Sequence, residues 1–111
     1  MSMYPTLKPG QFIVLDTWIY QDRAPQPDDV VVFQRGNKGL RLVKRVALWP
    51  DGKLQHEGLW YVLGDNQGAS HDSRYFGGIH TEQLAGQVKL VLLTIDHQHQ
   101  LLSDDTLRMV R

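Results

Sequence analysis

Short apolar runs that end at turn-forming residues divide this chain and leave little room for long helices. The apolar runs lie at 11–15, 30–33, 40–46, 60–63 and 86–95. Segments rich in Pro, Gly, Asn and Asp separate them, and the longest runs from 64 to 78. Short strands bounded by such residues are typical of a mainly β protein. We therefore predict an all-β fold, with one helical turn at 81–84, a short terminal helix at 103–109 that Ser103 caps, and no regular structure in 64–78.

The length of the chain limits it to one domain. With 111 residues it can bury a core of its own, but a second full domain does not fit. We expect a single domain over 1–111, with a core at 2–95 and a C-terminal extension at 96–111. Because no apolar run approaches the roughly 18 residues that span a bilayer, the chain as given is expected to be soluble, and its native location is undetermined.

Charge and cysteine content exclude several classes of function. Twelve basic residues balance twelve acidic ones, so no net positive charge favours a nucleic-acid partner, and we expect none. There is no cysteine, which excludes disulfides, thiolate metal sites and a cysteine nucleophile. His97 and His99 have a spacing that suits a shared face, but nothing completes a ligand set around them. We expect no metal and no cofactor.

Alternation along 40–46 places one lysine among apolar side chains. Leu40, Leu42, Lys44 and Val46 are predicted to share one face of a strand. A strand lysine usually extends its ammonium group to water. A lysine that is kept from water is instead a candidate base, because burial lowers its pKa. We expect Leu40, Leu42 and Val46 to supply part of that burial.

Three separated segments point to one kind of chemistry when they are taken together. They are SMYPTL at 2–7, KRV at 44–46 and GDNQGASHDSRYFGG at 64–78. In this order they closely resemble the serine, lysine and C-terminal signature boxes of type I signal peptidases, and the resemblance covers most of 2–93. KRV alone is common on strands, whereas the third segment is specific. The interpretation therefore rests on the presence of all three segments in this order.

The resemblance implies an endopeptidase in which Ser2 is the nucleophile and Lys44 is its general base. A serine hydroxyl is a weak nucleophile at neutral pH, so an uncharged neighbouring base must accept its proton. For lysine this requires the pKa to fall by about 3 units from about 10.4, or roughly 4 kcal/mol of differential interaction. The backbone N–H of Ser2 is the expected oxyanion donor, and such donors contribute roughly 3 to 4 kcal/mol.

Further residues receive supporting roles from the same resemblance. Ser70 is expected to orient the Lys44 amine by a hydrogen bond, and Asp72 and Arg74 are expected to support the site through an ion pair or backbone contacts. Without the resemblance, we would interpret Ser70 as a serine that hydrogen-bonds the local backbone of a turn. Asp72 and Arg74 would be interpreted as a solvated ion pair on the surface. Met3 and Tyr4 are expected to contact the substrate, although Met3 is an equally good candidate for the core.

The resemblance also implies a partly open β barrel, as in signal peptidases and self-cleaving SOS repressors. The partner would be a peptide or preprotein that binds extended at a sheet edge, with small residues near the cut. Larger relatives carry an accessory β domain for which 47–59 is too short, and a membrane anchor before the serine, where this chain has only Met1. The chain is thus similar in scale to conjugation-type and nickel superoxide dismutase maturation-type peptidases.

Other interpretations remain open. A catalytically inactive peptide-binding module would keep the fold without turnover. A self-cleaving repressor domain shares the Ser/Lys logic, but it needs a cleavable segment ahead of the nucleophile, so only cleavage in trans fits this chain. Trp18, Ile19 and Tyr20 are predicted to cover the core, with contact at a membrane surface as the alternative.

Overall fold

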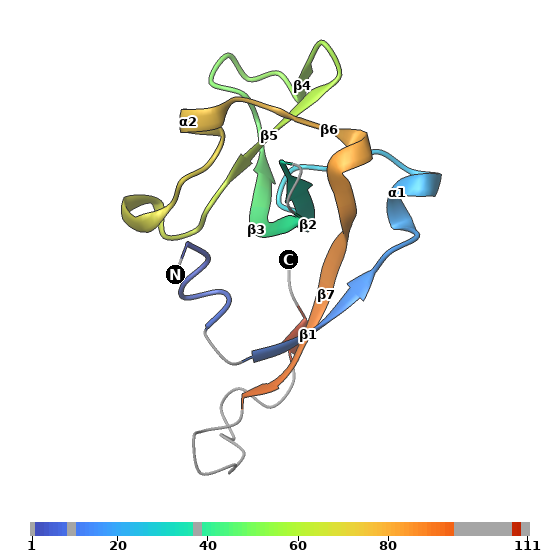
Figure 1. Ribbon diagram of the computed structural model, residues 1–111, viewed down its shortest axis with the longest axis vertical. Coiled ribbons are helices and arrows are strands. Elements are labelled where there is room, and N and C mark those ends of the chain that lie inside the picture. The colour runs from blue at the N-terminus through green and yellow to red at the C-terminus, as the bar shows by residue number, and fades with distance from the viewer. Residues whose placement is uncertain (1, 9–10, 37–38, 95–107, 110–111) are drawn as a thin grey trace.

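An antiparallel β-sheet organises the chain, as Figure 1 shows. The computed structural model describes residues 2–8, 11–36, 39–94 and 108–109. The all-β prediction is confirmed, but the sheet stays open and does not close into a barrel. The strands are β1 (Gln11–Asp16), β2 (Val30–Arg35), β3 (Leu40–Ala47), β4 (Gln55–His56), β5 (Leu59–Leu63), β6 (Ile79–His80), β7 (Leu84–Thr94) and β8 (Arg108–Met109). The helical turns are α1 (Ile19–Asp22), η1 (Gln67–Ala69), α2 (Ser73–Phe76) and η2 (Thr81–Gln83).

The strand order is β1-β7-β2-β3-β5-β4, with β6 also paired to β5 and β8 to β7. β2 and β3 form a hairpin in which Arg35 pairs with Leu40 and Val31 pairs with Lys44. β7 is the longest strand, as the sequence predicts, and it lies between β1 and β2. β3 therefore occupies an interior position in the sheet, and Lys44 lies near its middle.

The observed backbone tests three predictions of local structure. The predicted turn at 81–84 is present as η2. The segment 64–78 was expected to be irregular, but it contains η1 and α2, each a single turn. Part of the predicted helix at 103–109 lies outside the described residues, and its end is wrong because Arg108–Met109 pairs with β7 as β8.

Two hydrophobic clusters lie on opposite faces of β2, because successive side chains of a strand alternate. One cluster contains Met3, Leu7, Val30, Val32 and Val88. The other contains Val31, Phe33, Val46, Trp60, Val62 and Ile79. Val43 packs against the first cluster, and Leu42 packs against the second. The β2–β3 hairpin is therefore covered on both faces, which removes the middle of β3 from water.

A buried carboxylate fastens the loop before β2 to the sheet. Asp29 is completely buried. Its Oδ2 accepts hydrogen bonds from Tyr20 OH at 2.9 Å and from the Gln26 N–H at 3.1 Å. Its Oδ1 accepts one from Gln87 Nε2 at 3.2 Å, and Arg23 Nη2 lies 3.3 Å from Oδ2. A buried charge with this many partners connects α1, the loop and β7 in one network.

Replacing Asp29 by Asn is expected to lower the free energy of unfolding by about 1 to 3 kcal/mol, since donors that now face a carboxylate lose an acceptor inside the protein. Chemical denaturation followed by circular dichroism measures the change. Asp28→Asn is the matched control, because Asp28 is exposed and has φ of 75°, a conformation that Asn tolerates. Equal stability of the two variants would contradict a structural role for the buried carboxylate.

Candidate active site

The turn formed by residues 2–7 is anchored in the core by its apolar side chains. Met3 is 2% exposed and Leu7 is 6% exposed, and both belong to the first hydrophobic cluster. The Leu7 N–H donates to the Met3 carbonyl at 2.9 Å, which closes the turn. Met3 is therefore a core residue, whereas Tyr4 is half exposed. This packing fixes the position of the Ser2 backbone next to β3.

Ser2 and Lys44 come together although 41 residues separate them in the chain. Lys44 is 3% exposed, and a hydrogen bond joins its Nζ to Ser2 Oγ at 2.7 Å. A serine and a lysine at this distance have the reach required for direct proton transfer between hydroxyl and amine. The two side chains that the sequence placed at the centre of the chemistry are thus adjacent.

Burial lowers the pKa of the Lys44 amine below its ordinary value, and the nearby Asp72 carboxylate opposes this change. Val46 is fully buried and Leu42 is partly buried, so both help to exclude water from this face of β3. Leu40 was expected to contribute as well, but this is wrong because Leu40 is 55% exposed. The alternation of side chains along a strand shows which face a residue lies on. It does not show how far the residues that cover that face extend along the strand.

Asp72 is the centre of the hydrogen-bond network behind Lys44. Its carboxylate is fully buried and accepts from the Gly64 N–H at 3.0 Å and from Ser70 Oγ at 2.9 Å. Arg74 Nε donates to it at 2.8 Å, so the expected ion pair is present. Asp72 also caps α2 by accepting from the Arg74 N–H at 3.2 Å. This one residue connects β5, the loop and α2.

The hydrogen bond of Ser70 differs from the expectation. Ser70 Oγ donates to Asp72 Oδ2, and no hydrogen bond joins it to Lys44 in the part of the chain that the structure describes. Asp72 acts on the lysine instead, through its charge. Burial opposes the ionisation of Asp72, but hydrogen bonds from Arg74, Gly64 and Ser70 outweigh it and lower the pKa of Asp72 to about 2. Asp72 is therefore ionised at neutral pH.

A second network fastens the serine turn to the rest of the site. Arg45 donates to both carboxylate oxygens of Asp65 at 2.9 Å, and Thr6 Oγ1 donates to the same carboxylate. The Asn66 N–H donates to the Ser2 carbonyl at 2.7 Å. These residues all lie inside the three motif segments, so the motifs themselves were the available signal. Lys44 and Arg45, which are adjacent on β3, thus belong to different hydrogen-bond networks.

Gly64 occupies a point where two segments approach too closely for any side chain. A Cβ atom at this position would lie 2.1 Å from Ser70 Oγ and 2.7 Å from the Ser2 carbonyl oxygen. Neither distance is compatible with van der Waals contact. The absence of a side chain at residue 64 is therefore what allows the loop to contact the serine turn.

The remaining predicted residues lie elsewhere. Trp18 was predicted to cover the core, but this is wrong because it is 70% exposed. Ile19 is partly buried, and Tyr20 packs against the second cluster. His97 and His99 lie outside the described residues. Within the residues that are described, no group of three or more His, Cys, Asp or Glu side chains is arranged to hold a metal ion, and no helix is long and apolar enough to cross a membrane. Contact with a membrane surface stays a prediction.

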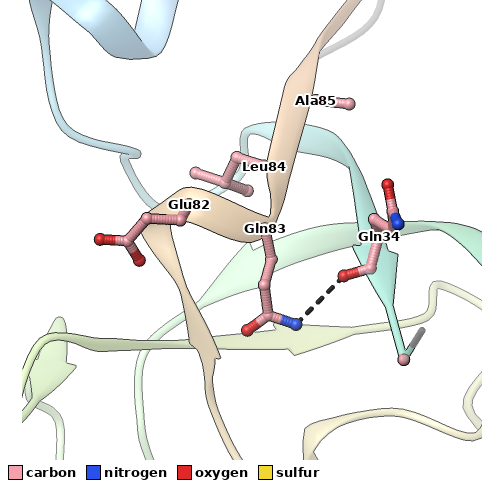
Figure 2. Close-up of a pocket in the computed structure, with 6 residues that line it drawn as sticks. Gln34, Glu82, Gln83, Leu84 and Ala85 are labelled. Carbon is pink, nitrogen blue, oxygen red and sulfur yellow. Dashed lines mark hydrogen bonds between the residues drawn. The ribbon is translucent and has the colours of Figure 1, made fainter. Parts of the chain in front are cut away.

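A hollow of about 470 Å³ lies away from this site, at the junction of β2, η2 and β7 (Figure 2). Gln83 Nε2 donates to the Gln34 carbonyl at its wall, at 3.1 Å. A neighbouring hollow of about 240 Å³ lies between Tyr20 and the start of β7. Neither is lined by Ser2 or Lys44. The size of a hollow is therefore a poor guide to the reactive groups here.

Replacing Gly64 by Ala is expected to lower the free energy of unfolding by about 1 to 3 kcal/mol, because the added methyl group displaces Ser70 or the Ser2 backbone. Thermal or chemical denaturation measures the loss. Gly68→Ala is the matched control in the same loop, since a Cβ there meets nothing within 4 Å, and its effect is expected to stay below about 1 kcal/mol. A Gly64→Ala protein as stable as the control would contradict the close approach.

Comparison with known proteins agrees with this geometry. The family described as signal peptidase, peptidase S26, matches residues 1–56 and 51–93. The two matched segments cover the serine turn, β3 and the loop that carries Asp72. A search of curated proteins finds no match. The match covers more than half of the chain, and the chain therefore belongs to the signal peptidase family, peptidase S26.

Proposed function

We propose that this protein is a serine endopeptidase of the signal peptidase type, in which Ser2 is the nucleophile and Lys44 is the general base. The observation that carries the proposal is the 2.7 Å contact between Lys44 Nζ and Ser2 Oγ, with the amine almost fully buried. The lowered pKa of Lys44 supports the same roles, because only a neutral amine accepts a proton. Membership of a peptidase family gives the reaction class.

The reaction proceeds in two halves. Ser2 Oγ attacks the carbonyl carbon of the substrate peptide bond while Lys44 Nζ accepts the hydroxyl proton. The tetrahedral intermediate collapses, the C–N bond breaks, and Nζ returns the proton to the leaving amine. Lys44 then takes a proton from water as the water oxygen attacks the Ser2 ester. When the bond between the acyl carbon and Ser2 Oγ breaks, Lys44 returns that proton to Oγ and the second product leaves. The backbone N–H of Ser2 is the proposed donor to the oxyanion.

Ser70, Asp72 and Arg74 support this chemistry by position and charge. Ser70 and Arg74 both hold the Asp72 carboxylate, and Asp72 raises the pKa of Lys44 against the larger effect of burial. The balance of these two effects sets the pH at which the amine becomes neutral. Asp72 thus keeps the lysine basic enough to take a proton, while burial keeps it from being permanently charged.

The substrate is proposed to bind as an added strand on β3. β3 pairs with β5 only over Arg45–Ala47, so Leu40–Lys44 have no strand partner on that side among the described residues. Backbone groups at such an edge are available to an extended peptide. A peptide there would run directly up to Lys44, with Met3 in the wall beneath it and Tyr4 at the rim. The packed wall favours small side chains next to the bond that is cut.

An activated peptide ester ending in alanine is expected to form a covalent adduct on Ser2 of the wild-type protein, detected by intact-protein mass spectrometry. Ser2→Ala and Lys44→Met should each reduce the rate of adduct formation at least about 1,000-fold, because nucleophile and base act as a unit. Lys53→Met is the control, since Lys53 is exposed on the turn between β3 and β4. A wild-type protein that binds the peptide but forms no adduct would favour the inactive binding module.

The rate of peptide cleavage is expected to rise with pH as the Lys44 amine loses its proton. Burial lowers the pKa of Lys44, so this acid limb lies below the value of about 10.4 for a free lysine. Asp72 attracts the charged form and so raises the pKa of Lys44. Replacing Asp72 by Asn removes the attraction and is expected to move the limb to lower pH, as measured by kcat/KM against pH.

The Asp72 variant also loses hydrogen bonds, so its fold is verified by circular dichroism and the limb is read from a normalised profile. Asp51→Asn is the control, because Asp51 is an exposed carboxylate paired with His56 and not with any group of the site. A limb that stays in place in a folded Asp72→Asn protein, or moves to higher pH, would exclude Lys44 as the titrating base.

A further inference from the structure

A group of cationic and aromatic side chains lies next to the candidate active site and has no part in the proposed chemistry. It consists of Arg35 at the end of β2, His71, and Tyr75 and Phe76 of α2, and we call it the cation–aromatic patch. The Arg35 guanidinium carbon lies 4.3 Å from the centre of the Phe76 ring. His71 stacks on Tyr75 with ring centres 5.1 Å apart and 13° between the planes, and it lies 5.8 Å from Phe76.

The charge of Arg35 is uncompensated in the described part of the chain. No carboxylate there forms an ion pair with it, whereas the nearby Arg74 is neutralised by Asp72. Arg35 is exposed, and Tyr75 is 67% exposed. A guanidinium over an aromatic face is held in place by cation–π attraction and retains its N–H groups for another partner. The patch therefore offers a positioned cation beside exposed rings.

The patch lies on the same face of the sheet as the Lys44 side chain. Arg35 lies on the same face of β2 as Val31 and Phe33, because every second side chain of a strand points the same way. Val31 pairs with Lys44 across the hairpin. Arg35 itself pairs with Leu40. Four residues of β3 therefore separate the level of the patch from the level of the proposed base, which is about 13 Å along a strand. An extended peptide of ordinary length covers that distance.

The Arg35 side chain links β2 to α2 through its contact with the Phe76 ring. Phe76 packs against Phe33, with ring centres 6.4 Å apart, and α2 contacts β5. β5 lies on the far side of β3 from β2. The Arg35 side chain therefore lies over the Phe76 ring, on the face of the sheet that carries Phe33. On β3, Leu40–Lys44 have no strand partner on the β5 side among the described residues.

We propose that the cation–aromatic patch is a substrate subsite that selects an acidic side chain a few residues away from the bond that is cut. An extended peptide alternates its side chains between two directions. One set faces Met3 and Val43, and the other set faces Lys44 and the patch. A carboxylate of the second set would pair with Arg35 beside the aromatic rings. This inference rests on the proposed function and extends it to the substrate.

The hollow of Figure 2 does not offer the same chemistry. It is lined by Gln34 and Gly36, the two neighbours of Arg35, but not by Arg35 itself. Its charged residue is Glu82, which would repel an acidic side chain. The anion-selecting surface is therefore assigned to the patch rather than to the larger hollow.

The test is a set of peptides that share small residues at the cut and carry one Glu, Gln or Lys at successive positions on each side. For the wild-type protein, kcat/KM is expected to be about two- to fivefold higher with Glu than with Gln at one position, the range of an exposed ion pair. Arg35→Gln should abolish this preference, and Arg35→Glu should transfer it to the Lys peptide at the same position. Lys53→Gln is the control, since Lys53 is an exposed cation on the turn between β3 and β4, outside the proposed peptide edge.

Binding measured with the Ser2→Ala protein separates this inference from the proposed function. Anisotropy of labelled peptides that shows an Arg35-dependent preference for Glu would support the subsite even if no peptide is cleaved. Cleavage with equal rates for Glu and Gln at every position, or a preference that survives Arg35→Glu, would overturn the subsite while leaving the protease intact. Failure of the peptides both to bind and to be cleaved would count against the subsite as well.

Discussion

Exclusion of water from the Lys44 amine is the constraint on which the site depends. Full burial can lower the pKa of a lysine by several units, whereas an ionised carboxylate nearby raises it. Lys44 experiences both, and burial is the larger effect. Because an unfolded lysine binds a proton more readily than the folded one, this residue lowers stability at neutral pH. The hydrophobic clusters on the two faces of the hairpin must offset that cost.

The hydrogen bonds to Asp72 explain how a buried, ionised carboxylate coexists with a lysine whose pKa is lowered by burial. Without hydrogen-bond donors around it, the Asp72 carboxylate would attract the Lys44 ammonium group through a medium of low dielectric. It would then strongly oppose the deprotonation of Lys44. Arg74 and the donors on Gly64 and Ser70 stabilise the carboxylate instead. Their positive ends offset part of the field that reaches Lys44. The same contacts hold the loop against the serine turn, so electrostatics and geometry are set by one network.

The sequence predicted what depends on local pattern or on recognisable motifs. Alternation placed Lys44 on an inward face, and the motif segments brought Ser2 and Asp72 into one hypothesis. It could not predict that Ser70 bonds to Asp72, because a hydroxyl has several partners within reach in a folded loop. α2 was missed because a single helical turn is too short to show a 3.6-residue period. Arg45 was set aside because its partner, Asp65, is 20 residues away and becomes a neighbour only after folding.

The two faces of the β2–β3 hairpin have different roles in the proposed active site. One face packs Met3 and so fixes the backbone of the nucleophile. The other face buries Lys44 and, further along the hairpin, presents Arg35 beside the rings of α2. A peptide bound as proposed on the edge of β3 would lie between the two faces and would contact both through alternate side chains. In that proposed complex, the small residues at the cut would meet the packed face, and the proposed preference for an acidic side chain would belong to the face that carries Lys44.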